Sequence, residues 1–186
     1  STGTAAIQLA AQVQFRRGQR IAVPDFTMVA TLHAVVAAGC VPVLVDCLPD
    51  SGQANPTTLR RLAQERSIDG AVIVSPFGAR VEIADYEELG LPLVYDLAGA
   101  WPQQLTTNYP ICYSCHATKN LSTREGGLIA LATETVWERA RRLSCFDLGP
   151  ERMPGTIYAN NFKMDEYRCA QLCQQIENPG EMATKM

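Results

Sequence analysis

The sequence predicts an α/β fold built around a mostly parallel β-sheet. Two observations lead to this prediction: short apolar runs rich in valine and isoleucine recur along the chain, and helical patterns separate most of them. Nearly continuous apolar runs are typical of strands covered on both faces, and alternation of strand and helix is typical of parallel sheets. With 186 residues, 47% of them hydrophobic and 19% charged, the chain can bury one sizeable core.

Six strands and six helices are expected. The expected strands are Arg20–Pro24, Val41–Asp46, Gly70–Ser75, Pro92–Asp96, Ile111–Ser114 and Gly127–Leu131. The expected helices are Thr4–Phe15, Met28–Ala38, Pro56–Glu65, Ile83–Leu89, Thr135–Ser144 and Met164–Ile176. The best candidate for a domain boundary is segment 147–156, which contains two glycines and two prolines. Residues 1–146 are therefore expected to form one large domain, and residues 147–186 a linker and a helical segment.

Charge and hydropathy patterns argue against two classes of partner. The net charge is −3, and the densest basic cluster, Arg139 to Arg142, is interpreted as a solvated helix face rather than a nucleic-acid footprint. The longest apolar stretch, Met28 to Leu48, is interrupted by polar residues, glycine and proline, so it predicts helix, turn and strand rather than a membrane span. No signal peptide is recognisable, and a cytoplasmic location is expected.

The seven cysteines are interpreted as small hydrophobic residues in a reducing compartment, because their number is odd. Cys112 to His116 also matches the Cys-x-x-Cys-His pattern of haem attachment. Strand alternation would direct the two cysteines of that pattern to different faces, which argues against haem. A four-cysteine zinc site lacks a second Cys-x-x-Cys, so no metal is expected.

Several residues with chemical potential follow the expected strands, where ligands bind in open parallel sheets. Asp96 ends one strand, and Ser114, His116 and Lys119 follow the end of another. The segment 2–5 (Thr-Gly-Thr-Ala) opens a helix, where free backbone amides and the helix dipole favour a phosphate group.

Taken together and in this order, four segments resemble the DegT/DnrJ/EryC1/StrS family of pyridoxal phosphate-dependent sugar aminotransferases. These segments are Thr2–Ala6, Pro24–Thr31, Tyr95–Ala98 and Ser114–Gly127, with a weaker match at Asn161–Glu166. The resemblance implies the type I aminotransferase fold, in which the large domain is a three-layer α/β/α sandwich with a mostly parallel sheet. Family members are much longer than this chain, so the chain resembles a partial member.

The resemblance implies that pyridoxal 5'-phosphate (PLP) is the cofactor. Lys119 would form a Schiff base with PLP and, once displaced by substrate, would move the proton between substrate and cofactor. Asp96 would pair with the pyridine nitrogen and keep it protonated, because a nearby carboxylate raises the pKa of that nitrogen. The implied reaction moves an amino group from glutamate to a nucleotide-linked keto-sugar.

Further residues are implied as cofactor contacts. Thr4, Ala5 and Ser114 would hold the phosphate, the first two partly through backbone amides. Met28 would lie over the cofactor ring, or else is a core methionine. The resemblance also implies a homodimer with a shared active site, in which Lys163 of one subunit reaches the phosphate in the other; the alternative is a surface lysine. His116 would orient its loop through a hydrogen bond.

Two departures favour a second interpretation. Family members commonly place glutamine or histidine at the position of Gly99, where it contacts the cofactor 3-hydroxyl, and the connection from Ala100 to Cys112 is short. A non-catalytic homologue that keeps the fold as a binding or assembly module is therefore the alternative. The presence of Lys119 argues against the family's dehydratase branch, which has histidine there.

Overall fold

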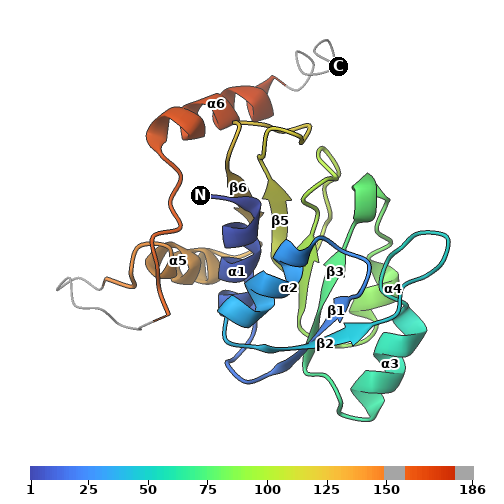
Figure 1. Cartoon of the computed structure of the whole chain (residues 1–186). Helices are drawn as coiled ribbons and strands as arrows, with labels where there is room; N and C mark the ends of the chain where they lie inside the picture. The colour runs from blue at the N-terminus through green and yellow to red at the C-terminus, as the bar shows by residue number, and fades with distance from the viewer. Residues whose placement is uncertain (149–157, 179–186) are drawn as a thin grey trace.

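The computed structural model describes residues 1–148 and 158–178. They form one six-stranded sheet with the order β2-β1-β3-β4-β5-β6 (Figure 1). The strands are β1 (Arg20–Pro24), β2 (Val41–Val45), β3 (Gly70–Val74), β4 (Leu93–Asp96), β5 (Ile111–Ser114) and β6 (Gly127–Ala130). The first five pair in parallel and β6 pairs antiparallel with β5, so the prediction of a mostly parallel sheet is confirmed.

All six expected helices are present. They are α1 (Gly3–Gln14), α2 (Val29–Ala37), α3 (Pro56–Gln64), α4 (Ala84–Glu87), α5 (Glu134–Leu143) and α6 (Glu166–Glu177). A short 3₁₀ turn, η1 (Pro76–Gly78), follows β3 and was not anticipated. The bounds agree with the sequence patterns to within two residues, because capping residues such as Thr2, Asn55 and Asp165 mark where helices begin.

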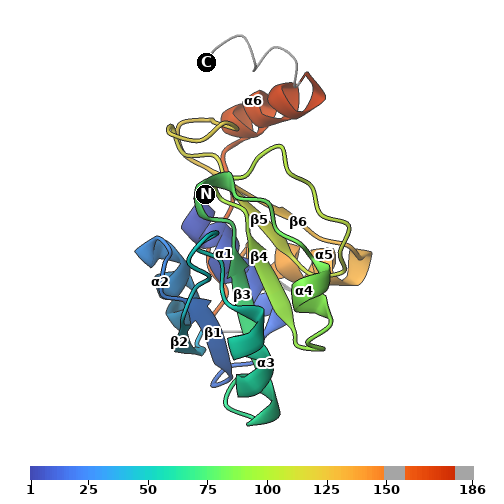
Figure 2. The same cartoon turned by 90° about the vertical axis from the view of Figure 1, so that its right-hand side faces the viewer.

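Helices cover both faces of the sheet, which confirms the three-layer arrangement (Figures 1 and 2). On one face α1 and α2 pack against the strands through Ile7, Ala10 and Val35. On the other face α3 and α4 do so through Leu59 and Tyr86. Helix α5 packs against α1 rather than against the sheet centre.

Strand β2 departs from the expectation of full coverage. Leu44 is 62% exposed and Val41 is 50% exposed, although every residue of β2 is apolar. β2 is the edge of the sheet, so it has one neighbouring strand and only partial cover from α2. An apolar strand surface is therefore left open on this side of the molecule.

The expectation for the cysteines holds in part. Cys40, Cys112 and Cys115 are buried, but Cys169 and Cys173 are exposed on α6, and all seven are free thiols. Cys112 and Cys115 belong to different core clusters, as strand alternation predicted. Burial raises the pKa of Cys115 to about 11, and burial together with the Asp96 charge raises that of Cys112. Both remain thiols at neutral pH.

Residues 149–156 of the predicted boundary lie outside the described residues, so the division into domains stays a prediction. Within the described part of the chain, no helix is both long and apolar enough to span a bilayer. The same residues contain no cluster of histidine, cysteine and carboxylate side chains suited to a metal ion.

Candidate active site

The candidate residues meet at the carboxyl edge of the sheet, where the parallel strands end side by side. Asp96, the last residue of β4, lies opposite Val74 of β3 and Cys112 of β5. Ser114 ends β5, and the loop that follows it carries Lys119. This edge therefore gathers residues that are far apart in the sequence.

The Asp96 carboxylate is buried and held by two donors. Its side chain is 3% exposed. The Thr31 hydroxyl of α2 donates to Oδ2 at 2.8 Å, and the backbone amide of Ala98 donates to Oδ1 at 3.1 Å. Thr27 lies 2.9 Å from Thr31, oxygen to oxygen, so the network reaches the loop after β1. These bonds fix the orientation of the carboxylate.

Burial dominates the ionisation of Asp96. It raises the pKa of the carboxyl group, although the Thr31 and Ala98 hydrogen bonds and the nearby charge of Lys119 act in the opposite direction. Two hydrogen bonds and the charge of one ammonium group do not offset the loss of water around the buried carboxylate. A cationic group placed against this carboxylate would therefore be strongly favoured.

Lys119 lies in the loop between β5 and β6. Backbone hydrogen bonds within this loop and the side chain of His116 hold the loop in place. The amide of Lys119 donates to His116 O at 2.9 Å, and that of Ala117 donates to Arg124 O at 2.9 Å. The His116 ring nitrogen Nδ1 lies 3.0 Å from the Thr118 hydroxyl. His116 thus bonds within its loop, as the sequence analysis expected.

Helix α6 supports the same loop from outside (Figure 1). Gln175 accepts a hydrogen bond from the Ser122 amide at 3.1 Å and donates to Ser122 O at 2.8 Å. Leu172 packs with Leu121 and Cys115. Because Lys119 belongs to this loop, α6 restrains the backbone that carries the lysine.

The Lys119 ammonium lies beside Gly99. A Cβ atom built on Gly99 would be 3.7 Å from Lys119 Nζ and 3.8 Å from Gly78 N, which are ordinary contacts. A Cβ atom is therefore tolerated at the position where family members were expected to place glutamine or histidine. Position 99 is occupied by glycine without any steric requirement for it.

The amino end of α1 lies directly on Ser114. A Cβ atom on Gly3 would be 2.8 Å from Ser114 Cβ and 2.9 Å from its Oγ, so only glycine permits this approach. The Ala5 amide already donates to Thr2 Oγ1 at 3.0 Å. The Gly3 and Thr4 amides precede the first possible i→i−4 bond, so they are the donors available to an anion.

Aromatic and sulfur side chains line the rim of this edge. Met28 is the N-cap of α2 and is 72% exposed, which rules out the interpretation as a core methionine. Phe77 in η1 is 96% exposed with a left-handed backbone (φ 50°), and its ring lies 6.1 Å from that of Phe26. Exposed rings beside a polar site are typical of a surface that is covered in use.

Lys163 lies in the segment before α6, next to Phe162, whose carbonyl oxygen accepts a hydrogen bond from the amino group of Ser1. It is exposed, and its Nζ lies 3.6 Å from Cys145 Sγ after α5. Its implied role at the phosphate of a second subunit therefore stays a prediction.

Sequence reasoning missed two supporting residues, Thr31 and Gln175. Thr31 entered the sequence analysis only as the last residue of the segment Pro24–Thr31, and no function was expected for Gln175. The spacing of Thr27 and Thr31 by four residues, at the start of a helix, is the only local signal for the first. Gln175 acts on a backbone 53 positions earlier, which no local pattern reveals.

A model of the DegT/DnrJ/EryC1/StrS aminotransferase family matches residues 1–185. The chain belongs to this family. Its members and its relatives are PLP-dependent aminotransferases, so PLP is the family's cofactor.

The chain is 26% identical over 187 residues to a candidate PLP-dependent aminotransferase, EpsN of Bacillus subtilis, covering 92% of this chain and 47% of EpsN. It is 24% identical to GDP-perosamine synthase of Vibrio cholerae, covering 95% of this chain and 50% of that protein.

Solved structures show the same fold. A candidate PLP-dependent aminotransferase of Bacillus cereus superposes with a TM-score of 0.88 at 27% identity, covering 97% of this chain and 52% of that chain. DesI, solved in the presence of its TDP-sugar product, gives a TM-score of 0.81 at 27% identity, covering 97% of this chain and 48% of that chain. The chain thus spans about half the length of the relatives it matches.

The residues at the carboxyl edge fit PLP. The buried Asp96 carboxylate calls for a cation, which a protonated pyridine nitrogen provides. The free amides at the start of α1 and the Ser114 hydroxyl suit a phosphate. Lys119 lies within electrostatic reach of Asp96, so amine and carboxylate face one site.

Replacing Asp96 by asparagine tests the buried charge. Because burial raises the pKa of Asp96, its ionised form opposes folding above the ordinary pKa of 3.8. Without PLP, we expect the Asp96→Asn chain to gain stability over the parent as pH rises from about 4 to 7, since only the parent must ionise a buried group. PLP retention should fall about tenfold or more, because a charge-assisted bond is lost.

Urea unfolding at several pH values measures the stability difference, and PLP absorbance measures retention. Asp50→Asn, at an exposed aspartate after β2, is the matched control and should change neither. A stability difference that does not vary with pH would contradict the assigned cause.

Removing the Gln175 side chain tests the support of the lysine loop. We expect Gln175→Ala to weaken PLP retention about fivefold, because two hydrogen bonds to the Ser122 backbone are lost and the loop loosens. Faster hydrogen exchange of the loop amides should accompany the loss. The exposed neighbour Gln174→Ala is the control, and equal effects of both variants would refute the role of Gln175.

Proposed function

We propose that this chain forms the cofactor-binding part of a transaminase that moves an amino group from glutamate to a nucleotide-linked keto-sugar. The observation that carries the proposal is the meeting of Lys119, buried Asp96 and the open amino end of α1 at one edge of the sheet. An amine, a carboxylate and an anion site in this arrangement suit PLP chemistry.

Each residue has a defined task in this proposal. With PLP bound, Lys119 would hold the cofactor covalently and, once released from it, would carry the proton to and from the substrate carbon. Asp96 keeps the pyridine nitrogen protonated, and its bonds to Thr31 and Ala98 hold the carboxylate in position. Bound PLP supplies an electron sink for the charge that develops on the substrate carbon.

The same proposal assigns the remaining contacts. The amides of Gly3 and Thr4 and the hydroxyl of Ser114 hold the phosphate, and Ala5 supports them through its bond to Thr2. Met28 covers one face of the ring from the N-cap of α2. The loop bonds of His116 and Gln175 limit the movement of Lys119.

The substrate class rests on relatives. One relative is named GDP-perosamine synthase, and another was solved in the presence of its TDP-sugar product. Both names concern nucleotide-linked sugars, which supports a keto-sugar acceptor for this chain. Glutamate as the amino donor comes from the family resemblance, and the experiment below uses it as the test compound.

A non-catalytic homologue is the second candidate, and one observation favours it. Gly99 provides no side chain beside Lys119, although the backbone there leaves room for one. Without a hydrogen bond to the cofactor 3-hydroxyl, the electronic tuning of the cofactor changes. The presence of both Lys119 and Asp96 supports catalysis over this alternative.

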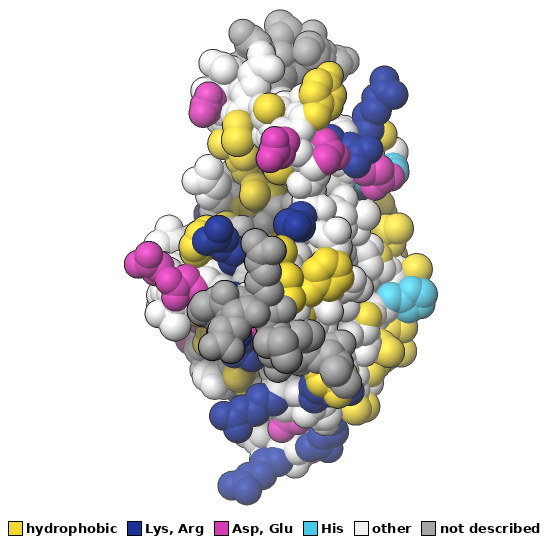
Figure 3. Space-filling view, turned by 90° about the vertical axis from the view of Figure 1, so that its left-hand side faces the viewer, with side chains coloured by type: hydrophobic (Ala, Val, Ile, Leu, Met, Phe, Trp, Pro, Cys, Tyr) yellow, Lys and Arg dark blue, Asp and Glu magenta, His cyan; other side chains and the backbone are white. Residues whose placement is uncertain are grey.

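The apolar surface next to the site supports a homodimer with a shared active site. Helix α2 has no charged residue, and Val29 and Val36 on its outer side are more than half exposed. This surface continues to Met28 at the site and to Leu44 on β2. In the space-filling view, hydrophobic side chains gather beside a histidine along this side (Figure 3). Exposed apolar side chains on two neighbouring elements suit subunit contact.

A cytoplasmic location belongs to the same proposal. All seven cysteines are free thiols, including two exposed on α6, and such thiols suit a reducing compartment.

The decisive experiment traps PLP on the protein. The purified chain is incubated with PLP, reduced with borohydride and digested, and we expect the label on the peptide that contains Lys119 and on no other. Lys119→Arg, which keeps the charge, should remain unlabelled. Absence of label from the parent chain would refute the proposal, while labelling without amino-group exchange from glutamate would favour the non-catalytic alternative.

Mixing two defective chains tests the shared site. Lys119→Ala should hold no cofactor covalently, and Lys163→Ala should hold it about tenfold more weakly because a charged phosphate contact is lost. If Lys163 reaches the site of the other subunit, equal mixing makes about half of the dimers mixed, and each mixed dimer contains one complete site and one defective site. About a quarter of all sites should then bind PLP with full affinity. A Lys163→Ala chain that binds PLP like the parent, or a mixture without restoration, would contradict the contact.

A further inference from the structure

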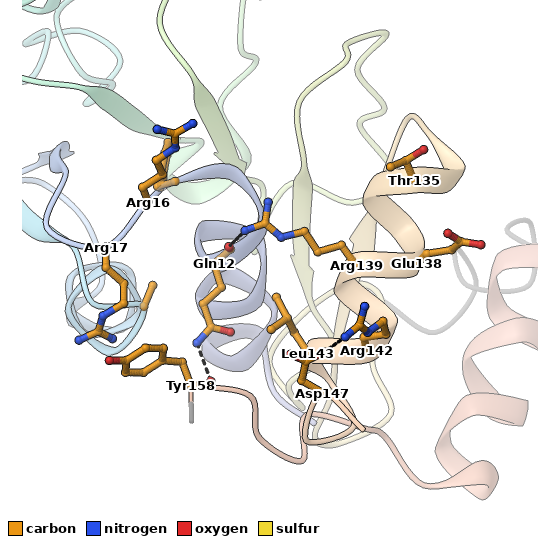
Figure 4. A pocket seen from close by; sticks show the side chains of 12 residues that line it. Gln12, Arg16, Arg17, Thr135, Glu138, Arg139, Arg142, Leu143, Asp147 and Tyr158 are labelled. Atoms are coloured by element: carbon orange, nitrogen blue, oxygen red, sulfur yellow. Dashed lines mark hydrogen bonds and ion pairs between the residues drawn. The ribbon is translucent and has the colours of Figure 1, made fainter. Parts of the chain in front are cut away.

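A cavity of about 720 Å³ opens between α1, α5 and Tyr158, away from the candidate active site (Figure 4). It adjoins the carboxyl end of α1, whereas the Gly3 and Thr4 amides begin the same helix. A helix of 12 residues is about 18 Å long, so the cavity and the free amides lie at opposite ends of α1. The volume falls within the range of sites for small molecules.

The wall of this cavity is basic. Four arginines line it, together with the carboxylates of Glu138 and Asp147. Arg142 is paired with Asp147 at 2.7 Å. Among the residues that the structure describes, Arg16, Arg17 and Arg139 have no carboxylate within ion-pair distance. The described lining residues therefore carry excess positive charge.

Contacts with neighbouring groups hold two of these guanidinium groups in place. Arg17 lies over the Tyr158 ring, 3.5 Å from its centroid. Arg139 donates to Gln12 O and Val13 O at 3.3 Å each. Arg139, Arg141 and Arg142 are all exposed, as the interpretation as a solvated helix face predicts. Arg139 and Arg142 also line the cavity, whereas Arg141 lies over Trp137 outside it.

The end of α1 works against an anion, since the last carbonyl groups of a helix carry partial negative charge. Arg139 offsets this effect by bonding two of those carbonyl groups. Attraction for an anion must therefore come from the guanidinium groups, which bind phosphate and carboxylate oxygens in pairs.

Gln12 provides a second and independent feature. It is 8% exposed and lies between the Arg17–Tyr158 side and the Arg139–Arg142 side of the cavity (Figure 4). Its Nε2 donates to Tyr158 O at 3.0 Å, which fixes the direction of the amide. Its Oε1 is buried, and no residue within 1–148 or 158–178 provides a hydrogen-bond partner for it. A buried acceptor without a donor is unfavourable, so a ligand that brings an O–H or N–H group is favoured.

We propose that this cavity binds inorganic phosphate, whose ions at neutral pH keep at least one proton. The anionic oxygens contact Arg139 and its neighbouring guanidinium groups, and the P–O–H group donates to Gln12 Oε1. Sulfate has a similar shape and charge but no proton at neutral pH, so it cannot make the bond to Gln12. This site is independent of the proposed transaminase activity.

Inorganic phosphate is the probe. The ¹⁵N-labelled chain is titrated with phosphate and, separately, with sulfate, and backbone amide resonances are followed. We expect saturable shifts at Arg16, Arg17 and Leu143 with phosphate, and at least about tenfold weaker binding of sulfate. Shifts at Gly3, Thr4 and Ser114 report the cofactor site separately, so failure of one site is distinguishable from failure of the other.

Matched variants assign the contacts. Gln12→Met keeps the side-chain volume and should abolish the preference for phosphate over sulfate. Arg139→Gln should weaken both anions about tenfold, and Arg17→Gln, which does not cap α1, repeats the test without that structural role. Arg141→Gln, on the same helix but outside the cavity, should change nothing. Equal affinity for phosphate and sulfate, shifts confined to the cofactor site, or an equal effect of Arg141→Gln would overturn the proposal.

Discussion

A buried carboxylate at the end of a central strand is the constraint on which the site depends. Asp96 cannot reach water, and burial outweighs the groups that favour its ionised form. Every element near it contributes to holding it: α2 through Thr31, the following turn through Ala98, and the β5–β6 loop through the charge of Lys119. The fold buries a carboxylate whose ionised form is unfavourable, and a cationic ring nitrogen at this position would stabilise that ionised form.

Glycine and helix contacts then decide the geometry around that charge. The missing side chain of Gly3 lets α1 begin against Ser114, and Gln175 fixes the far side of the lysine loop. None of these groups is reactive. They determine the positions of the amine, the carboxylate and the free amides, and catalysis by positioning requires such supports around the reactive groups.

The strands and helices were predictable because their signals are local. Valine-rich runs, capping residues and glycine turns occur within a few positions of the elements they define, so even the ends of α1 and β5 were placed closely. The exposure of β2 was not predictable, because it depends on which strand lies at the sheet edge. The partners of Asp96 and of the lysine loop required knowledge of which helix lies over which strand. The cavity at the end of α1 was unpredictable for the same reason, because Gln12 and Arg139 are distant in sequence and meet only in the fold.

The contact between Gly3 and Ser114 also constrains how the sequence can diverge. A methyl group at position 3 would overlap Ser114 Cβ at 2.8 Å and approach its Cα to 3.3 Å, so shortening the serine side chain to alanine gives no relief. Substitutions at positions 3 and 114 are therefore coupled, because a larger residue at either position would clash with the other. In an alignment of homologues that keep this helix start, glycine at position 3 should accompany a small residue at position 114. Loss of either would mark lineages in which the helix has moved away from the strand and the anion site has changed.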